Sequence, residues 1–307
     1  MNPSDYQKTK DSFITYMKSR AFTQNSIRSR LIIFRIYWKW LAKENLEVEQ
    51  VTYNELLGFM KWCSNNGASQ RTIQNYIGTI KHLYEHFIRE GKATKNPATD
   101  ITIKGVKRKV LYHIIEPHEL HALYNNYPAT SLQQSRSRVI LGMLVYQGLK
   151  TFELGMLEVN DINLREGKLN VKGSARSNSR EMKLEAHQIM DIYDYVLKVR
   201  GELIQMDTKR KAQAKEETSK LFIGEGGTCY SFSNFMTQVM VTVRKLNPNV
   251  LNAKQIRTSV ITKWLKMYNL REVQYLAGHR YISSTESYLH NDMEGLQEEV
   301  QQFHPVG

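Results

Sequence analysis

Hydrophobic residues recur every three or four positions in the first part of the chain, and this spacing predicts helices with one buried face. One such stripe begins after Thr23–Asn25, which suits a helix N-cap, and continues to about Lys43. Its apolar positions are Ile27, Leu31, Phe34, Trp38 and Leu41. A shorter helix is expected to begin at Asp11 and to reach Lys18.

Two further helices are predicted before Gly91. Thr52 and Glu55 have the spacing of a capping box, in which each side chain satisfies a free N–H group at a helix start. Ser69 suits the N-cap of the next helix, and Gly91 suits its end. The apolar face of that helix holds Ile73, Ile77, Ile80, Tyr84 and Phe87. Residues 1–100 are therefore expected to form a small helical bundle.

The pattern changes after Asn96-Pro97. Residues 101–115 begin with the basic stretch ITIKGVKRKV, which has no core periodicity and predicts an extended linker. Residues 116–307 then form a second domain, in which a strongly apolar helix is expected from Ser131 to Gly148.

Two short runs in the second domain alternate between apolar and polar residues, which is the period of a β-strand. They are Gly167–Val171 and Arg180–Leu184, with residues 173–179 as the turn between them. Helical stretches follow at His187–Leu203 and Ser231–Leu246. The predicted fold class is therefore mainly α with a small β-hairpin, an α+β fold.

The stretch from Asn252 to His290 is the most informative part of the chain. Its first half predicts a buried helix face, made by Ile256, Val260, Ile261, Trp264, Leu265 and Tyr268. A second short helix, Arg271–Ala277, ends at Gly278, where a backbone with positive φ costs least. Residues 293–303 predict a short amphipathic tail helix.

Composition and charge narrow the class of protein. The chain is 41% hydrophobic with 6 prolines, which indicates an ordered globular protein, and no apolar run approaches the length of a membrane span. The first ten residues lack the apolar stretch of a secretory signal, and Cys63 and Cys229 lack metal-ligand spacing. These features predict a reduced, intracellular protein of the cytoplasm, with neither metal nor membrane.

Net charge points to a polyanionic partner. The chain carries +13, and residues 1–110 hold 19 basic and 9 acidic side chains, a net charge of +10. For any single basic residue a solvated helix face is the simpler explanation. Together, Arg, Asn and Gln on two helices suit phosphate contact and major-groove reading. The candidates for DNA contact are Arg28, Arg30, Arg71, Gln74, Asn75 and Lys81.

Two motifs in the second domain carry candidate chemistry. The first reads Gly-Leu-Lys-x-x-Glu-Leu from Gly148, with Lys150 at its third position, and an Asp-Ile pair follows at Asp161. The second reads Lys-x-x-Arg from Lys254, then Leu-Ala-Gly-His, and then a tyrosine nine residues after the histidine. In order and spacing these motifs resemble box I and box II of the tyrosine recombinases and integrases.

The resemblance implies a SAM-like core-binding domain followed by a catalytic domain, and it implies a role for each site residue. Tyr288 would attack a phosphodiester and form a 3′-phosphotyrosine. Arg257 and His279 would bind the phosphate. Lys150 stands where the family has arginine, and it supplies a charge without the planar fork that binds two oxygens. Lys254 stands where most members have histidine, which is the pattern of poxvirus-type IB topoisomerases.

The same resemblance places a lysine on the predicted hairpin, as the proton donor to the departing 5′ oxygen. Lys172 is the candidate, and Lys183 and Arg176 are alternatives because the turn is long. An exposed strand residue without a catalytic role is an equally good interpretation of Lys172. The linker resembles the strap between the family's two domains, so Lys107 and Arg108 join the predicted DNA contacts. Arg176, in the predicted hairpin turn, is a further predicted DNA contact.

The predicted function is site-specific DNA recombination or integration, for a mobile element, without any cofactor. Expected partners are double-stranded DNA with inverted-repeat or attachment-type sites and further copies of this chain, in a homotetramer joined by the C-terminal tail. A DNA-bending accessory protein is a further candidate partner, and the protein is expected at the nucleoid. A type IB topoisomerase is one alternative, favoured by Lys254. A catalytically weakened DNA-binding relative is another, favoured by Lys150.

Overall fold

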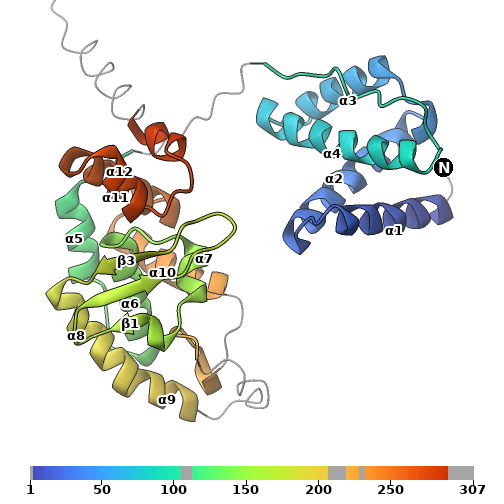
Figure 1. The fold of residues 1–307 in the computed structure, drawn as a ribbon. Helices are drawn as coiled ribbons and strands as arrows, with labels where there is room; N and C mark the ends of the chain where they lie inside the picture. Colours follow the sequence, from blue (N-terminus) through green and yellow to red (C-terminus); the bar gives the residue numbers. More distant parts are fainter. Residues whose placement is uncertain (1–2, 105–112, 207–218, 228–231, 290–307) are drawn as a thin grey trace, which may run out of the picture. The chain divides into compact units, whose positions relative to one another are not determined.

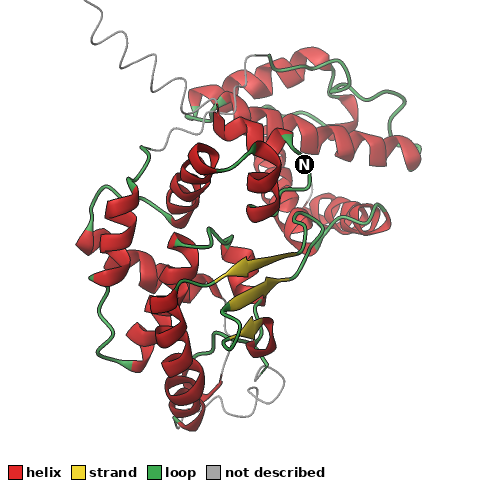
Figure 2. Ribbon diagram, turned by 60° about the vertical axis from the view of Figure 1, so that its left-hand side comes forward, coloured by secondary structure: helices red, strands yellow, loops and turns green. Residues whose placement is uncertain are grey.

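The computed structural model describes residues 3–104, 113–206, 219–227 and 232–289. The chain divides into two compact units, Met1–Lys109 and Val110–Gly307, and each is described by itself. Helices make up most of the described residues, and three strands form one small sheet (Figure 2). The expected mainly α fold with a small sheet is confirmed.

The first unit is a bundle of four α-helices (Figure 1). They are α1 (Pro3–Ser19), α2 (Gln24–Lys43), α3 (Tyr53–Asn65) and α4 (Gln70–Arg89), and the 3₁₀ turn η1 (Val48–Gln50) precedes α3. Thr23 and Ser69 cap α2 and α4 as predicted, and the capping box of α3 is present. The first helix begins at Pro3, earlier than the expected Asp11, because Tyr6 packs against the core with its ring 5.6 Å from that of Trp38.

Aromatic side chains fill the core of this bundle. The Tyr37 and Tyr84 hydroxyls lie 2.9 Å apart, and Tyr84 donates to the carbonyl of Val48 at 2.6 Å, so no buried hydroxyl is left unpaired here. Ile101 is buried in the same core, so the start of the predicted linker 101–115 packs on the bundle. Residues 105–112 lie outside the described residues.

The second unit is built around α6 (Leu132–Val145), which is buried along most of its length. Its first helix is α5 (Pro117–Asn125), with the predicted proline in the first turn. The elements that follow α6 in the described ranges are α7 (Thr151–Met156), η2 (Val159–Asp161), α8 (Ala186–Asp194), the π-helical turn η3 (Tyr195–Val199), α9 (Arg200–Gln205), η5 (Glu225–Gly227), α10 (Phe232–Leu246), α11 (Ala253–Met267) and α12 (Leu270–Leu276).

The sheet is antiparallel, in the order β1-β2-β3. Strands β2 (Lys168–Val171) and β3 (Arg180–Lys183) match the predicted hairpin, and Leu169 pairs with Met182 on the buried face. A third strand, β1 (Ile162–Asn163), was not predicted, because two residues are too short to show an alternating pattern.

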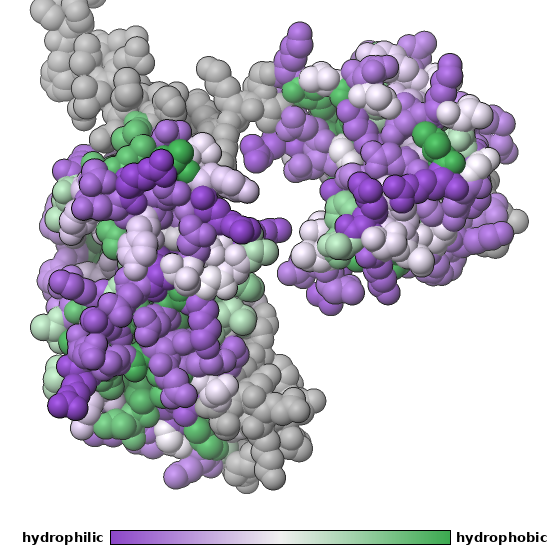
Figure 3. Space-filling view, in the orientation of Figure 1, coloured by the Kyte–Doolittle hydropathy of each residue, from purple (hydrophilic) through white to green (hydrophobic). Residues whose placement is uncertain are grey.

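One face of each unit is mainly polar (Figure 3). On the face drawn in Figure 3, hydrophilic residues cover most of each unit and hydrophobic ones are scattered among them. Within the described ranges, no helix combines the length and the apolar character that crossing a membrane requires.

Candidate active site

Box II is carried by α11 and α12. Asn252 caps α11, and its side chain accepts the N–H of Gln255 at 3.0 Å, so the helix begins where the sequence pattern predicted. Lys254 and Arg257 are three residues apart, but Lys254 is exposed whereas Arg257 is buried. The turn after α12 closes at Gly278, whose φ of +60° is one that glycine adopts without strain.

Arg257 joins box I to box II. One of its terminal N–H groups donates to the carbonyl of Gly148, and the other donates to the carbonyl of Ala277 at 2.7 Å. The second group also lies 3.3 Å from Nε2 of His279. Burial lowers the pKa of Arg257, and the nearby Glu153 carboxylate and the hydroxyl of Tyr288 oppose that shift.

The contacts of His279 define its tautomer. A guanidinium can only donate, so Nε2 of His279, which faces Arg257, must accept and carries no proton. The proton therefore lies on Nδ1, which is 2.9 Å from the hydroxyl of the buried Thr285. Burial, followed by the charges of Arg257 and Lys150, lowers the pKa of His279 to about 3. The imidazole is neutral at physiological pH.

Tyr288 lies next to this histidine. Residues 283–289 are helical, and this helix presents Tyr288 and Thr285 to the same neighbour. The rings of Tyr288 and His279 are stacked, with centroids 5.8 Å apart and planes inclined by 17°. Tyr288 is half-buried and packs against the core of the unit. The tyrosine, the histidine and Arg257 are therefore contiguous.

Lys150 approaches the same region from box I. Its ammonium lies 3.7 Å from a carboxylate oxygen of Glu153 and is half-buried. Burial lowers its pKa, as do the charges of Arg257 and Arg180, while Glu153 raises it. A lysine with a lowered pKa gives up its proton more readily than one in water.

Glu153 and Arg180 form a buried, bidentate ion pair. The two terminal nitrogens of Arg180 donate to the two carboxylate oxygens of Glu153 at 3.1 and 2.9 Å. Although burial acts in the opposite direction, the hydrogen bonds and charge of Arg180 lower the pKa of Glu153 to about 2. Glu153 also accepts the backbone N–H of Lys150 at 2.9 Å, so the pair fixes the start of α7.

Arg180 also explains why box II needs glycine at its turn. A Cβ atom at Gly278 would lie 2.3 Å from Nη1 of Arg180, too close for any side chain. The hairpin turn is tied to the same place, because Asn178 donates its backbone N–H to the Gly278 carbonyl at 3.3 Å and Arg280 donates to the Ala175 carbonyl at 2.8 Å. The turn is thus held against the segment that carries the histidine.

The Lys172 side chain is directed toward two carboxylates rather than toward Arg257 and His279. Its ammonium lies 2.6 Å from Glu158 and 3.3 Å from Asp161, and its side chain is 57% exposed. The hydrogen bond to Glu158 raises its pKa. The two alternatives, Arg176 in the turn and Lys183 on β3, are both exposed. In this arrangement Lys172 is not part of the Arg257–His279 group.

The predicted DNA-contacting residues of the first unit fall into two sets. Four are exposed on the helices and available to a partner; these are Arg28 on α2 and Arg71, Gln74 and Asn75 on α4. Arg30 instead lies over the Phe22 ring and donates to the Thr79 hydroxyl at 3.2 Å. Lys81 donates to the carbonyls of Thr99 and Ile101 at 3.0 and 3.2 Å. Lys107 and Arg108 lie outside the described residues.

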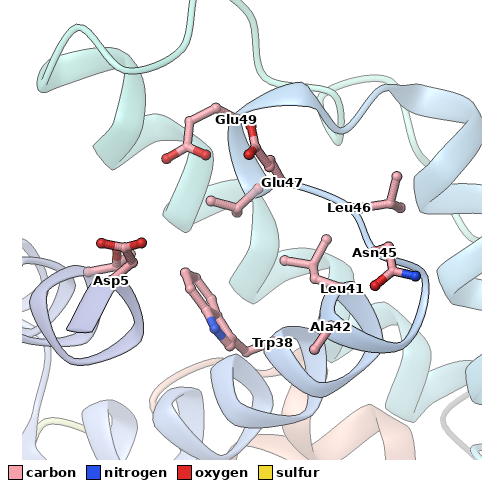
Figure 4. A pocket seen from close by; sticks show the side chains of 10 residues that line it. Asp5, Trp38, Leu41, Ala42, Asn45, Leu46, Glu47 and Glu49 are labelled. Atoms are coloured by element: carbon pink, nitrogen blue, oxygen red, sulfur yellow. The ribbon is translucent and has the colours of Figure 1, made fainter. Parts of the chain in front are cut away.

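A cavity of about 470 Å³ lies on another part of this bundle (Figure 4). Trp38, Leu41 and Ala42 of α2 contribute to its lining, together with Asp5, Glu47 and Glu49. Three carboxylates would repel a phosphate, so this part of the unit does not suit DNA. The exposed face of α4 is better suited to DNA.

Sequence reasoning missed two residues that the site depends on. Thr285 fixes the tautomer of His279, and Arg180 fixes Glu153. Thr285 is one of several hydroxyl residues before the tyrosine, and Arg180 reads as the first residue of a strand, so neither position carried a local signal. Among the described residues, no group of three or more His, Cys, Asp or Glu is arranged to hold a metal ion.

Comparison with known proteins assigns the chain to a family. The phage integrase family matches residues 113–295, and the N-terminal SAM-like domain of phage integrases matches residues 10–91. The chain therefore belongs to the phage integrase family of tyrosine recombinases, whose members are DNA strand-transferring enzymes.

Individual relatives align with this chain over nearly the whole length of both proteins. Tyrosine recombinase XerD of Staphylococcus haemolyticus is 27% identical over 292 residues, which cover 93% of this chain and 94% of XerD. Tyrosine recombinase XerC of Oceanobacillus iheyensis is 24% identical over 302 residues, which cover 96% and 95%.

Two solved structures share the fold at low identity. The integrase of transposon Tn1549, in complex with a circular intermediate DNA, has a TM-score of 0.67 at 15% identity and covers 93% of this chain and 98% of its own. A lambda integrase tetramer bound to a Holliday junction has a TM-score of 0.65 at 14% identity, covering 92% and 76%.

Proposed function

We propose that this protein is a site-specific DNA recombinase that cuts and rejoins DNA through a covalent 3′-phosphotyrosine, in the service of a mobile element. The observation that carries the proposal is the contiguous set of Tyr288, His279 and Arg257, in which a hydroxyl nucleophile lies beside a neutral imidazole and a buried guanidinium. A phosphodiester needs this combination of nucleophile, hydrogen-bonding group and positive charge.

In the proposed reaction the Tyr288 oxygen bonds to phosphorus, and the bond from phosphorus to the 5′ oxygen breaks. Water takes the proton of the Tyr288 hydroxyl, and the leaving 5′ oxygen gains a proton. Arg257 binds a non-bridging oxygen, and Lys150 and Lys254 add positive charge around the pentavalent phosphate. Lys172 is the proposed proton donor to the 5′ oxygen, and it must leave Glu158 to act.

His279 contributes a hydrogen bond rather than a charge. Its Nε2 accepts from Arg257 in this arrangement, and its pKa of about 3 keeps it neutral. Thr285 holds the Nδ1–H tautomer and so keeps the unprotonated Nε2 facing Arg257. These two residues position Arg257 and Tyr288 without exchanging protons with solvent near neutral pH.

The proposed partner is double-stranded DNA with paired recognition sites, bound by the exposed face of α4 and by Arg28. The Tn1549 and lambda integrases are bound to DNA in their structures, which supports this choice. A ring of four protomers, joined through the tail helix 293–303, would exchange two strands at a time. That tail lies outside the described residues.

Type IB topoisomerase activity is the alternative, because Lys254 occupies the position of the family's usual histidine. Both activities form the same covalent intermediate. They differ in outcome, since a topoisomerase relaxes supercoils without joining new partners.

Tyr288→Phe tests the proposal. Supercoiled DNA containing candidate recombination sites is incubated with the full chain, and covalent adducts are detected as protease-sensitive gel shifts. Wild type should form adducts, and Tyr288→Phe should form none while binding DNA as before. Tyr281→Phe is the matched control, because Tyr281 is a nearby tyrosine that is 70% exposed.

Three results would contradict the proposal in different ways. Adducts that persist in Tyr288→Phe would place the nucleophile elsewhere. Adducts that lead only to relaxation would indicate the topoisomerase. A wild-type chain that binds DNA but forms no adduct would indicate a weakened relative, as Lys150 suggests.

A further inference from the structure

Gly78 of α4 and Gly201 of α9 are the helical glycines, among the described residues, whose Cβ position is open. A Cβ atom added at Gly78 would meet no heavy atom within 4 Å apart from the backbone of its own helix. Two other helical glycines differ, because a Cβ at Gly142 would lie 2.7 Å from the Tyr124 ring and one at Gly155 would lie 3.1 Å from Phe232. Those two glycines permit close packing inside the protein, and Gly78 does not.

Glycine in the interior of a helix is unfavourable, because it loses more backbone freedom on folding than alanine does. Contacts within the described part of the chain give no reason for Gly78. One remaining use of a missing side chain is to let another molecule approach the helix backbone.

The surroundings of Gly78 indicate what that molecule is. Gln74 and Asn75 lie one helical turn before it, and both are exposed. Lys81 and His82 lie one turn after it and are half-buried. The face around Gly78 therefore carries two exposed amides, whereas Lys81 donates to the carbonyls of Thr99 and Ile101 and the His82 ring lies 3.1 Å from the Glu85 carboxylate. Exposed amides of this kind suit the base edges of nucleic acid.

We infer that Gly78 is the point at which α4 comes closest to the DNA duplex, with the helix backbone itself in contact with the DNA. This inference rests on the proposed function. Without a Cβ the helix lies deep enough for Gln74 and Asn75 to reach base edges. A side chain at position 78 would hold both amides away from the duplex.

Gly78→Ala is the test, and Gly201→Ala in α9 is its matched control. Gly201 is also helical and also has open space at its Cβ, but it lies in the other unit. Both substitutions should raise the melting temperature by about 2–8 °C, because alanine forms helices better. Gly78→Ala alone should bind DNA at least about tenfold more weakly.

The DNA probe is a duplex selected in vitro by the full wild-type chain from a random pool. The dependence of affinity on salt should be the same for wild type and Gly78→Ala, since no charge has changed. Gly78→Leu should weaken binding further than Gly78→Ala. Equal binding by wild type and Gly78→Ala, or equal weakening by both alanine variants, would overturn the inference.

The proposed function is checked in the same preparation. If the wild-type chain selects a duplex and forms the Tyr288 adduct, but Gly78→Ala binds normally, only the inference fails. If the wild-type chain selects no duplex, the proposed DNA partner fails first and the inference fails with it.

Discussion

The Arg257–His279 group and the hairpin lysine, Lys172, belong to the same proposed site, but they differ in burial and in hydrogen bonding. Arg257 and His279 are both 7% exposed and have hydrogen-bond partners on several segments. Lys172 is 57% exposed and is held by an ion pair with Glu158. Arg257, which is proposed to bind phosphate, and His279, which is proposed to position it, are therefore preassembled, whereas the proposed proton donor must be brought in.

Physical chemistry accounts for this difference. A buried guanidinium needs hydrogen-bond partners, because an unpaired buried charge costs far more than an exposed one. The bonds that satisfy Arg257, to the carbonyls of Gly148 and Ala277, also fix its position. An exposed lysine pays little for leaving one carboxylate, since surface ion pairs contribute little to stability. Burial therefore fixes the position of Arg257, whereas exposure leaves Lys172 able to move.

The largest effect is expected from Arg257→Lys. Lysine cannot reach the same carbonyls and a phosphate oxygen together, because it lacks the planar fork. Single-turnover cleavage should fall by about 10²–10³-fold, as when one donor to a transition-state oxyanion is lost. Arg271→Lys, at an exposed arginine of α12, is the control. A loss smaller than about tenfold would mean that the buried group is structural rather than preassembled for catalysis.

Glu153→Gln tests how the preassembled half is stabilised. The variant leaves Arg180 buried without its counter-charge, so stability should fall by about 3–5 kcal/mol at neutral pH. The pKa of Glu153 is about 2, below its ordinary value of 4.5, so the folded state binds its proton less readily than the unfolded state does. The ion pair therefore stabilises the protein above about pH 4.5 and loses this contribution as pH falls toward 2.

Urea titrations across this pH range measure the difference between wild type and Glu153→Gln. The difference should be largest at neutral pH and should shrink below about pH 4.5. Glu181→Gln, at an exposed position on β3, should show little difference at any pH. A gap between wild type and Glu153→Gln that does not change with pH would show that the loss comes from packing and not from charge.

The two halves of the site also differ in how far the sequence predicted them. The resemblance of the motifs to those of tyrosine recombinases grouped Arg257, His279 and Tyr288, and the structure places them together. Helix starts with a capping side chain were predicted well, because caps such as Thr23 and Ser69 act on N–H groups within three residues. Local chemistry of this kind is visible in the sequence.

What the sequence left open depends on contacts between distant segments. Arg180 and Glu153 are 27 residues apart, and nothing near either residue signals a buried pair. The direction of Lys172 is set by Glu158, which lies just before η2, and the short strand β1 has too few residues to predict. Charge pairing between residues far apart in the sequence therefore determines the features that periodicity and motifs did not predict.

The smallest effect, and the sharpest test of the contrast, is expected from Glu158→Gln. Removing this carboxylate should leave Lys172 with Asp161 alone, at 3.3 Å, and should lower its pKa toward the ordinary value, because the Glu158 hydrogen bond is the main cause of the raised pKa. If Lys172 is the proton donor, single-turnover cleavage should rise by roughly two- to fivefold, as expected for a surface ion pair.

A substrate with sulfur in place of the 5′ bridging oxygen supplies the control. Its thiolate leaves without a proton, so Glu158→Gln should have no effect on it. Equal rates for wild type and Glu158→Gln on the normal substrate would point to Lys183 or Arg176 as the donor, and equal losses on both substrates would make Glu158 a structural residue.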